Sequence, residues 1–91
     1  MKRYTVDYAK SAQRTLRKMD PGVRAMIMRW IDKNLVHCSD PRAHGKALSG
    51  NLSGLWRYRV GNYRLIAEIR DDRLVILMLE VGHRGIGRAH V

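Results

Sequence analysis

The chain has 91 residues and carries 18 lysines and arginines against 8 aspartates and glutamates, which gives it a formal net charge of +10 at pH 7. Its length suits one small domain with a modest core, and its 45% of apolar residues argues against wholesale disorder. We therefore expect a single domain over residues 1–91. The charge favours a nucleic acid, a ribonucleoprotein, an anionic membrane or an acidic protein as partner, with a solvated basic surface as the alternative.

Cysteines, histidines and apolar runs narrow the class further. Cys38 is the only cysteine, so no internal disulfide can form. The four histidines and Cys38 have no recognised metal-ligand spacing, and we expect neither a metal nor another cofactor. The N-terminus lacks the apolar run of a secretory signal, and no segment approaches the roughly 20 apolar residues that span a bilayer. We expect a cytoplasmic protein without a membrane partner.

The start of the chain predicts a short strand followed by a helix. Residues 2–7 alternate as in a strand, with Tyr4 and Val6 on one face. From about Asp7 the spacing becomes helical and separates an apolar stripe, expected in the core, from a basic stripe. The apolar stripe comprises Tyr8, Ala12, Leu16 and Met19, and the basic stripe comprises Lys10, Arg14, Arg17 and Lys18.

A second helix is predicted to begin at Asp20-Pro21. Aspartate is a favoured N-cap acceptor, and proline suits the first helical position because it has no N–H to leave unpaired. Apolar residues then recur at helical intervals, while Arg24, Arg29 and Lys33 fall largely outside. The apolar residues assigned to the core are Val23, Met26, Ile27, Trp30, Ile31 and Leu35.

The remainder predicts a loop and then three sequential antiparallel strands. Residues 37–53 are typical of a loop with at most a short turn of structure, and the strands cover residues 55–60, 63–69 and 74–81. Residues 74–79 are continuously apolar, which is typical of a strand buried on both faces. The predicted fold class is α+β, with two N-terminal helices packed on one face of an antiparallel sheet.

The first two of these strands form a hairpin with an unusual charge pattern. A two-residue turn at Gly61-Asn62, a dipeptide suited to positive φ angles, fixes the cross-strand pairs as Val60–Tyr63, Arg59–Arg64 and Arg57–Ile66. Because side chains alternate along a strand, Arg57, Arg59 and Arg64 share one face, which we call the hairpin arginines. Like charges set opposite each other destabilise a hairpin by roughly 0.2–1 kcal/mol. We therefore expect this surface to bind an anion.

Five segments, in this order and at these separations, resemble the RelE/ParE superfamily of toxins from bacterial and archaeal toxin–antitoxin systems. They are Asp20-Pro21 and residues 48–54 (LSGNLSG), 55–61 (LWRYRVG), 63–66 (YRLI) and 81–84 (VGHR). The resemblance covers most of the chain and implies the strand–helix–helix–three-strand fold (β-α-α-β-β-β) that was expected from the residues alone.

The two branches of this superfamily imply different activities. RelE-type toxins enter the ribosomal A site and cleave messenger RNA, whose own 2′-hydroxyl attacks the adjacent phosphate, whereas ParE-type toxins act on DNA gyrase. Both are held inactive by an antitoxin, and the RelB-like antitoxins lay an acidic or amphipathic segment over the basic surface. The resemblance therefore implies a cognate antitoxin and, for the RelE branch, the 70S ribosome with its mRNA and ribosomal RNA as partners.

RNA cleavage by this route needs in-line alignment, proton transfer and cations on the phosphorane. By resemblance, Arg64 and Arg84 stabilise charge on the scissile phosphate, while Arg57 and Arg59 grip the RNA backbone. The alternatives are an ion pair between Arg64 and Glu68, and a solvated Arg84. Arginine suits phosphate because its fork binds two oxygens, but it stays protonated at every relevant pH, which makes it a poor proton carrier.

Residues after the last strand complete the predicted site. The family often has a tail tyrosine at the position that His90 occupies here, and a histidine is suited to proton transfer near neutral pH. We therefore expect His90 to be catalytic, with a frayed terminus as the alternative. For His83, a structural or solvent-facing role is expected.

The leading interpretation of the sequence is a metal-independent, ribosome-dependent mRNA endoribonuclease toxin that inhibits translation. The basic stripe then docks on ribosomal RNA through phosphate contacts, unless it is simply a solvated face. Two other interpretations stay open. One is a ParE-like gyrase inhibitor without ribonuclease activity, and the other is a catalytically degraded module that binds an antitoxin or nucleic acid.

Overall fold

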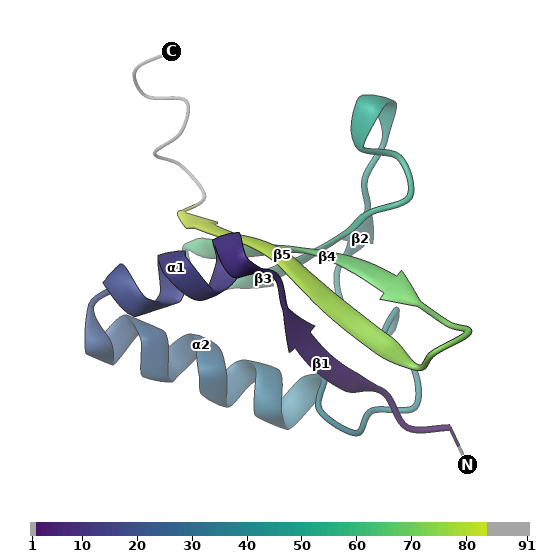
Figure 1. The fold of residues 1–91 in the computed structure, drawn as a ribbon, viewed down its shortest axis with the longest axis horizontal. Coiled ribbons are helices and arrows are strands. Elements are labelled where there is room, and N and C mark those ends of the chain that lie inside the picture. Colours follow the sequence, from purple (N-terminus) through teal and green to yellow (C-terminus); the bar gives the residue numbers. More distant parts are fainter. Residues whose placement is uncertain (1, 84–91) are drawn as a thin grey trace.

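In the computed structural model, which describes residues 2–83, two helices lie against one face of a five-stranded sheet (Figure 1). The elements in chain order are β1 (Thr5–Tyr8), α1 (Lys10–Lys18), α2 (Pro21–Asn34), β2 (Lys46–Ala47), the 3₁₀ turn η1 (Gly50–Leu52), β3 (Trp56–Val60), β4 (Tyr63–Arg70) and β5 (Val75–His83). The predicted α+β class with two N-terminal helices on the sheet is confirmed.

The sheet has the strand order β1-β5-β4-β3-β2. The three sequential strands β3, β4 and β5 are antiparallel, as predicted, but β1 pairs in parallel with β5, so the sheet is mixed. The two-residue strand β2, which pairs with the start of β3, extends the sheet beyond the strands that the sequence predicts. From β2 the chain runs out through η1 and returns to β3, and this excursion stands away from the rest of the fold (Figure 1).

The core lies between the helices and the inner face of the sheet, and both predicted apolar helix stripes contribute to it. Ala12 and Leu16 of α1 are buried, and so are Ile27 and Ile31 of α2 with Leu35 directly after it. Burial of each large aliphatic side chain is worth about 1.5–3 kcal/mol. The inner-face residues that meet them are Tyr58, Val60, Leu65, Ala67, Ile76, Met78 and Val81.

The start of α2 has the predicted capping geometry. The Asp20 carboxylate accepts hydrogen bonds from the backbone N–H groups of Gly22 at 3.0 Å and Val23 at 3.2 Å, and Pro21 occupies the first helical position. The cap satisfies two of the N–H groups that the first turn of a helix leaves without intrahelical partners. It also turns the chain between the two helices.

The strand β5 corrects the prediction that residues 74–79 are buried on both faces. Ile76 and Met78 are fully buried against the helices, whereas Val75, Leu77 and Leu79 are only half-buried. Both helices lie on the same side of the sheet, so the other face of β5 lacks a covering helix layer within the part of the chain that the structure describes.

A β-bulge in β5 allows a charged residue to follow the buried segment. The register with β4 shifts between Ile66, which pairs with Glu80, and Ala67, which pairs with Met78. In a regular strand Met78 and Glu80 would share a face, because side chains two apart point the same way. The bulge lets Met78 point into the core while Glu80 is exposed.

The loop between α2 and β2 is held by a polar network. The Arg42 guanidinium donates to both carboxylate oxygens of Asp71, at 3.1 and 3.0 Å, and the Tyr4 hydroxyl donates to Asp71 Oδ1 at 2.6 Å. Tyr58 donates its hydroxyl hydrogen to the carbonyl of Pro41 at 2.7 Å. These bonds tie the loop to the segment before β1, to the turn before β5 and to β3.

Gly45 allows the same loop to approach β3 closely. Its φ is +81°, and a Cβ on this residue would overlap the carbonyl oxygen of Arg57 and lie 2.8 Å from Trp56 Nε1. The adjoining carbonyl, that of His44, accepts a 2.6 Å hydrogen bond from Trp56 Nε1. Glycine is therefore required here both for its backbone conformation and for the close contact.

Gly45→Ala is expected to lower the free energy of unfolding by about 2–4 kcal/mol, because αL strain adds to a clash with backbone. Gly50→Ala is the matched control, since Gly50 also has a positive φ (+66°) but open space around it. The control variant is expected to lose only about 1 kcal/mol. Urea unfolding of both variants measures the difference, and equal losses would show that the close approach to β3 does not matter.

The network around Asp71 is expected to make stability depend on pH. Hydrogen bonds from Arg42 and Tyr4 hold the pKa of the Asp71 carboxyl below its ordinary value of 3.8. The contribution of Asp71 to stability is therefore present above that ordinary value and is lost as the pH falls through the lower pKa of the folded state. The melting-temperature gap between the wild type and Asp71→Asn should shrink as the pH falls from about 6 to about 2.5.

Asp72→Asn provides the control for this measurement, because Asp72 is an exposed neighbour of the same charge. Its melting temperature should follow that of the wild type across the range. The gap for Asp71→Asn will be modest, since the Arg42–Asp71 pair is about half exposed to solvent. A gap that stays constant down to the lowest pH would contradict the role of the charged carboxylate.

Candidate functional site

The β3–β4 hairpin has the predicted register. Val60 pairs with Tyr63, Arg59 with Arg64, and Arg57 with Ile66. Of the two turn residues only Gly61 takes a positive φ, at +60°, and this is the pattern of a type II′ turn, whose first central residue needs such an angle. The turn therefore sets the arginines directly opposite each other.

The hairpin arginines lie on the face of the sheet that points away from the helices. Tyr58 and Val60 alternate with them along β3 and are buried, while Arg59 and Arg64 are exposed and Arg57 is half-buried. Packing of the inner face thus fixes which way the arginines point. The three guanidinium groups are presented together on one outward surface.

Lys46 adds a fourth cation that the sequence did not reveal. It pairs with Arg57 across β2 and β3, and paired residues on neighbouring strands share a face. The sequence offered no signal for it, because a two-residue strand is too short to show alternation and residues 37–53 were predicted to be a loop. The loop prediction is wrong at this position, although η1 is the kind of short turn that was allowed for.

The ion pair expected as the alternative for Arg64 does not form between the described residues. Glu68 instead accepts a hydrogen bond from Arg70 Nη2 at 3.3 Å, on the same strand. On its other side Arg64 pairs with Gly82 of β5, and a Cβ placed on this glycine would have no atom within 4 Å. Gly82 therefore places no side chain beside Arg64, and no described atom fills that position.

His83 has a structural contact, in line with the role expected for it. Its ring packs edge-on against Tyr63, with 4.8 Å between the ring centroids, and the two residues are cross-strand partners. Arg84 and His90, the other predicted catalytic residues besides Arg64, lie outside the described residues, so their roles stay predictions.

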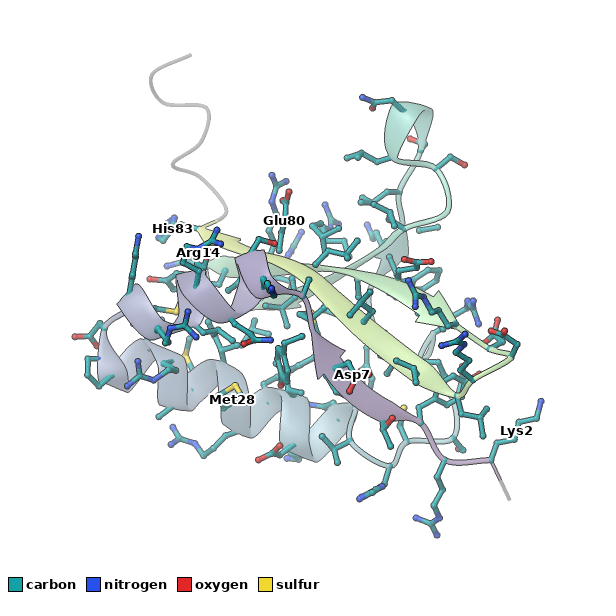
Figure 2. All side chains as sticks on the ribbon, viewed as in Figure 1. Lys2, Asp7, Arg14, Met28, Glu80 and His83 are labelled. Atoms are coloured by element: carbon teal, nitrogen blue, oxygen red, sulfur yellow. The ribbon has the colours of Figure 1, made fainter. Side chains whose placement is uncertain are left out.

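The basic stripe lies in a different layer from the hairpin arginines. Lys10, Arg14, Arg17 and Lys18 are all exposed on α1, which belongs to the helix layer. Figure 2 shows Arg14 on α1 at the end of the sheet where β5 carries Glu80 and His83. The two sets of cations therefore lie on different elements, the basic stripe on α1 and the hairpin arginines on β3 and β4.

A hollow at the free edge of β3 adjoins the hairpin arginines. It has a volume of about 390 Å³ and is lined by Trp30, His44, Gly45, Lys46, Arg57 and Arg59. Sequence reasoning assigned Trp30 to the core and His44 to a loop. The structure brings both to the site, because α2 passes beneath β3 and the Gly45 loop returns alongside it.

The described residues offer neither a cluster of metal ligands nor a membrane-spanning helix. No group of three or more histidine, cysteine, aspartate or glutamate side chains within residues 2–83 is placed to hold a metal ion. Neither α1 nor α2, the two α-helices of this part of the chain, combines the length and the apolar character needed to cross a membrane. The chemistry that this surface offers is that of fixed positive charge.

Comparison with known proteins finds toxins of toxin–antitoxin systems. The chain is 33% identical over 81 residues to Toxin RelG of Mycobacterium tuberculosis, covering 89% of this chain and 91% of that protein. Among solved structures, the chain matches the toxin–antitoxin complex RelBE2 of Mycobacterium tuberculosis with a TM-score of 0.76 and 30% sequence identity. The match covers 90% of this chain and 99% of that chain. The isolated RelE toxin of E. coli shares the fold, with a TM-score of 0.73 at 21% identity, covering 96% and 90%.

A family model gives the same assignment. The family described as ParE toxin of type II toxin-antitoxin system, parDE, matches residues 6–86, which includes every element of the fold except the first residue of β1. The superfamily resemblance predicted from the sequence is thereby confirmed. The chain belongs to the ParE toxin family of type II toxin–antitoxin systems, within the RelE/ParE superfamily.

Proposed function

We propose that this toxin cleaves messenger RNA in the ribosomal A site and so inhibits translation. The observation that carries the proposal is the set of hairpin arginines, held on one exposed face with Arg59 directly opposite Arg64. A surface of this kind matches the RNA backbone, which presents closely spaced phosphates. The proposal assigns the protein to the cytoplasm, where ribosomes translate.

Arg64 is the residue assigned to the scissile phosphate. An exposed guanidinium beside the open space at Gly82 can offer two parallel N–H groups to two phosphoryl oxygens. The negative charge on those oxygens grows as the 2′-hydroxyl oxygen attacks the phosphorus, so a fixed cation stabilises the transition state more than the ground state. Arg57 and Arg59 hold the flanking backbone, and Arg84 is proposed as a second contact to the phosphate.

Proton transfer is assigned to another group, because the hairpin arginines offer only guanidinium groups for this purpose. The attacking 2′-hydroxyl must lose a proton, and the leaving 5′-oxygen must gain one. Arginine stays protonated at all relevant pH values and does neither task well. We assign this step to His90, whose imidazole ordinarily titrates near neutral pH. The proposed reaction needs no metal ion.

The basic stripe on α1 is proposed to dock the toxin on ribosomal RNA. Its four cations are exposed and lie in the opposite layer from the hairpin arginines, so they can contact ribosomal phosphates while the other face holds the message. Phosphate contacts of this type position a protein without reading sequence. The stripe is therefore a positioning surface in this proposal and takes no part in the chemistry.

A cognate antitoxin is proposed to cover the hairpin arginines. The RelBE2 relative is a toxin–antitoxin complex, and a structural neighbour from E. coli is RelE bound to a peptide of the antitoxin RelB. For this chain an acidic or amphipathic segment would neutralise the same opposed arginines that RNA neutralises. Binding of the antitoxin and binding of RNA would then exclude each other, because both compete for one surface of the toxin.

A ParE-like action on DNA gyrase is the second candidate function. It is favoured by the match to the ParE family over residues 6–86 and by the absence of tyrosine after Tyr63 in the sequence. In this case the hairpin arginines bind without cleaving. A catalytically degraded module that retains only antitoxin or nucleic-acid binding is the third candidate. In that case, too, the hairpin arginines bind without cleaving.

One experiment separates these functions. The purified protein is added to a translating extract, the ends of the message are mapped, and a gyrase supercoiling reaction is run beside it. Cuts that are phased with codons and require ribosomes are expected, with a cyclic phosphate on one product and a 5′-hydroxyl on the other. Loss of supercoiling with an intact message would overturn the proposal in favour of gyrase.

Arg64→Ala is expected to reduce the rate of message cutting by about 10²–10³-fold, the usual effect of removing one preorganised transition-state contact. Ribosome binding, measured by co-sedimentation, should change little. Arg64→Lys should recover only part of the rate, because a lysine keeps the charge but cannot form the paired hydrogen bonds.

Arg29→Ala is the matched control, since Arg29 is exposed on α2 and belongs to neither basic surface. It should cut at the wild-type rate. Unchanged cutting by Arg64→Ala would remove Arg64 from the mechanism.

A further inference from the structure

The hollow at the free edge of β3 has the features of a binding site, and the cleavage proposal uses only two of its lining residues, Arg57 and Arg59. Its volume of about 390 Å³ falls in the range of roughly 300–1,000 Å³ that small-molecule sites occupy. Within the described residues, β2 covers β3 only at Trp56 and Arg57, so the edge beyond Arg57 stays open. The hollow lies along this open edge.

One wall of the hollow is aromatic and is fixed by the fold. Trp30 reaches from α2 and contacts the buried Tyr58, with 5.7 Å between the ring centroids, so its position is set by the core. His44 meets Trp30 edge-on, also at 5.7 Å and with an interplanar angle of 72°. The two rings form a corner whose orientation does not depend on a ligand.

The loop that carries His44 is anchored at its backbone. The His44 carbonyl accepts a hydrogen bond from Trp56 Nε1 at 2.6 Å, and the next residue, Gly45, approaches the Arg57 carbonyl too closely for any side chain. The imidazole is nevertheless exposed, so the anchoring leaves the ring free to contact a ligand. The site is preorganised, which lowers the entropy lost on binding.

The remaining walls supply positive charge. Lys46, Arg57 and Arg59 line the hollow, and no carboxylate is among the described residues that line it. Two of these cations are hairpin arginines, and Arg59 is also the cross-strand partner of Arg64. The hollow is therefore continuous with the surface assigned to the scissile phosphate.

An aromatic corner next to clustered cations matches the two parts of a nucleotide. Proteins bind single-stranded RNA by stacking its bases on aromatic rings while basic side chains follow the backbone. An acidic peptide would use the cations, but its carboxylates would gain nothing from the flat faces of Trp30 and His44. The combination favours RNA over a peptide.

We propose that this hollow binds one nucleotide of the RNA next to the scissile phosphate. The base packs in the corner formed by Trp30 and His44, and the phosphate of the same nucleotide is held by Lys46, Arg57 and Arg59. The inference rests on the proposed function, which makes RNA the substrate. It adds a base-binding subsite on the opposite side of Arg59 from Arg64.

The test measures binding to the free protein without ribosomes. Nucleoside 5′-monophosphates are compared with ribose 5-phosphate and inorganic phosphate, which have the same charged group and no base, and with a short acidic peptide. Isothermal titration at low salt gives the affinities. The monophosphates should bind about tenfold more tightly than ribose 5-phosphate, as expected when one base stacks on an aromatic side chain.

Two substitutions of the same kind localise the effect. His44→Asn should weaken nucleotide binding severalfold and leave ribose 5-phosphate binding unchanged. His37→Asn is the matched control, because His37 is exposed outside the hollow and has a φ of +63°, an angle that asparagine tolerates well. It should change neither affinity. Lys46→Gln should weaken both kinds of ligand, because it removes a phosphate contact and no ring.

Equal affinity for probes with and without a base would overturn the subsite, and so would base-dependent binding that His44→Asn leaves intact. Binding of the acidic peptide alone would assign the hollow to a protein partner and would also overturn it. These outcomes are independent of the extract assay. Base-independent binding rejects the subsite even where the message is cut, and base-dependent binding lost in His44→Asn supports the subsite even where the message stays intact.

Discussion

The direct opposition of Arg59 and Arg64 across the β3–β4 hairpin is the constraint on which the rest of this structure depends. Like charges at paired positions oppose hairpin formation by roughly 0.2–1 kcal/mol, so other interactions must hold the strands in this register. The Gly61 turn holds the register at the end of the hairpin. Along the strands, the register is held by the burial of Tyr58, Val60 and Leu65 against the helices. The core therefore forces the arginines together on the outer face.

This division of the sheet into two faces explains how a domain of this size carries a large positive charge. The inner face and the helices contain the core, while the hairpin arginines lie on the outer face and the basic stripe lies on the outside of α1. The loop fixed by Asp71 and Gly45 then adds a hollow at the edge where the layers meet. A polyanion can thus contact cations and an aromatic corner without any change in the core.

Much of the fold was predictable from the sequence, because its determinants are local. The Gly61-Asn62 turn fixed the hairpin register, and Asp20-Pro21 fixed the start of α2. The strand β2 and the parallel pairing of β1 were not predictable in this way. Lys46 and Ala47 are too few to show a period, and β1 joins β5 through contacts between residues about 70 positions apart in the chain.

The candidate site was predictable only in part. The hairpin arginines follow from alternation along two strands, but the hollow combines Trp30, His44 and Lys46 from three separate segments. No sequence period connects such residues, and Trp30 followed the helical spacing of the core. The close approach of Gly45 to Arg57, which brings these segments together, is visible only in three dimensions. The roles of Arg84 and His90 remain predictions.

A double-mutant cycle on Arg59 and Arg64 tests the central claim most directly. The free energies of unfolding are measured for the wild type, Arg59→Gln, Arg64→Gln and the double variant, with and without a saturating short single-stranded RNA. We predict a repulsive coupling of roughly 0.2–1 kcal/mol in the free protein that disappears when RNA is bound. A coupling that is zero or attractive in the free protein would contradict the account.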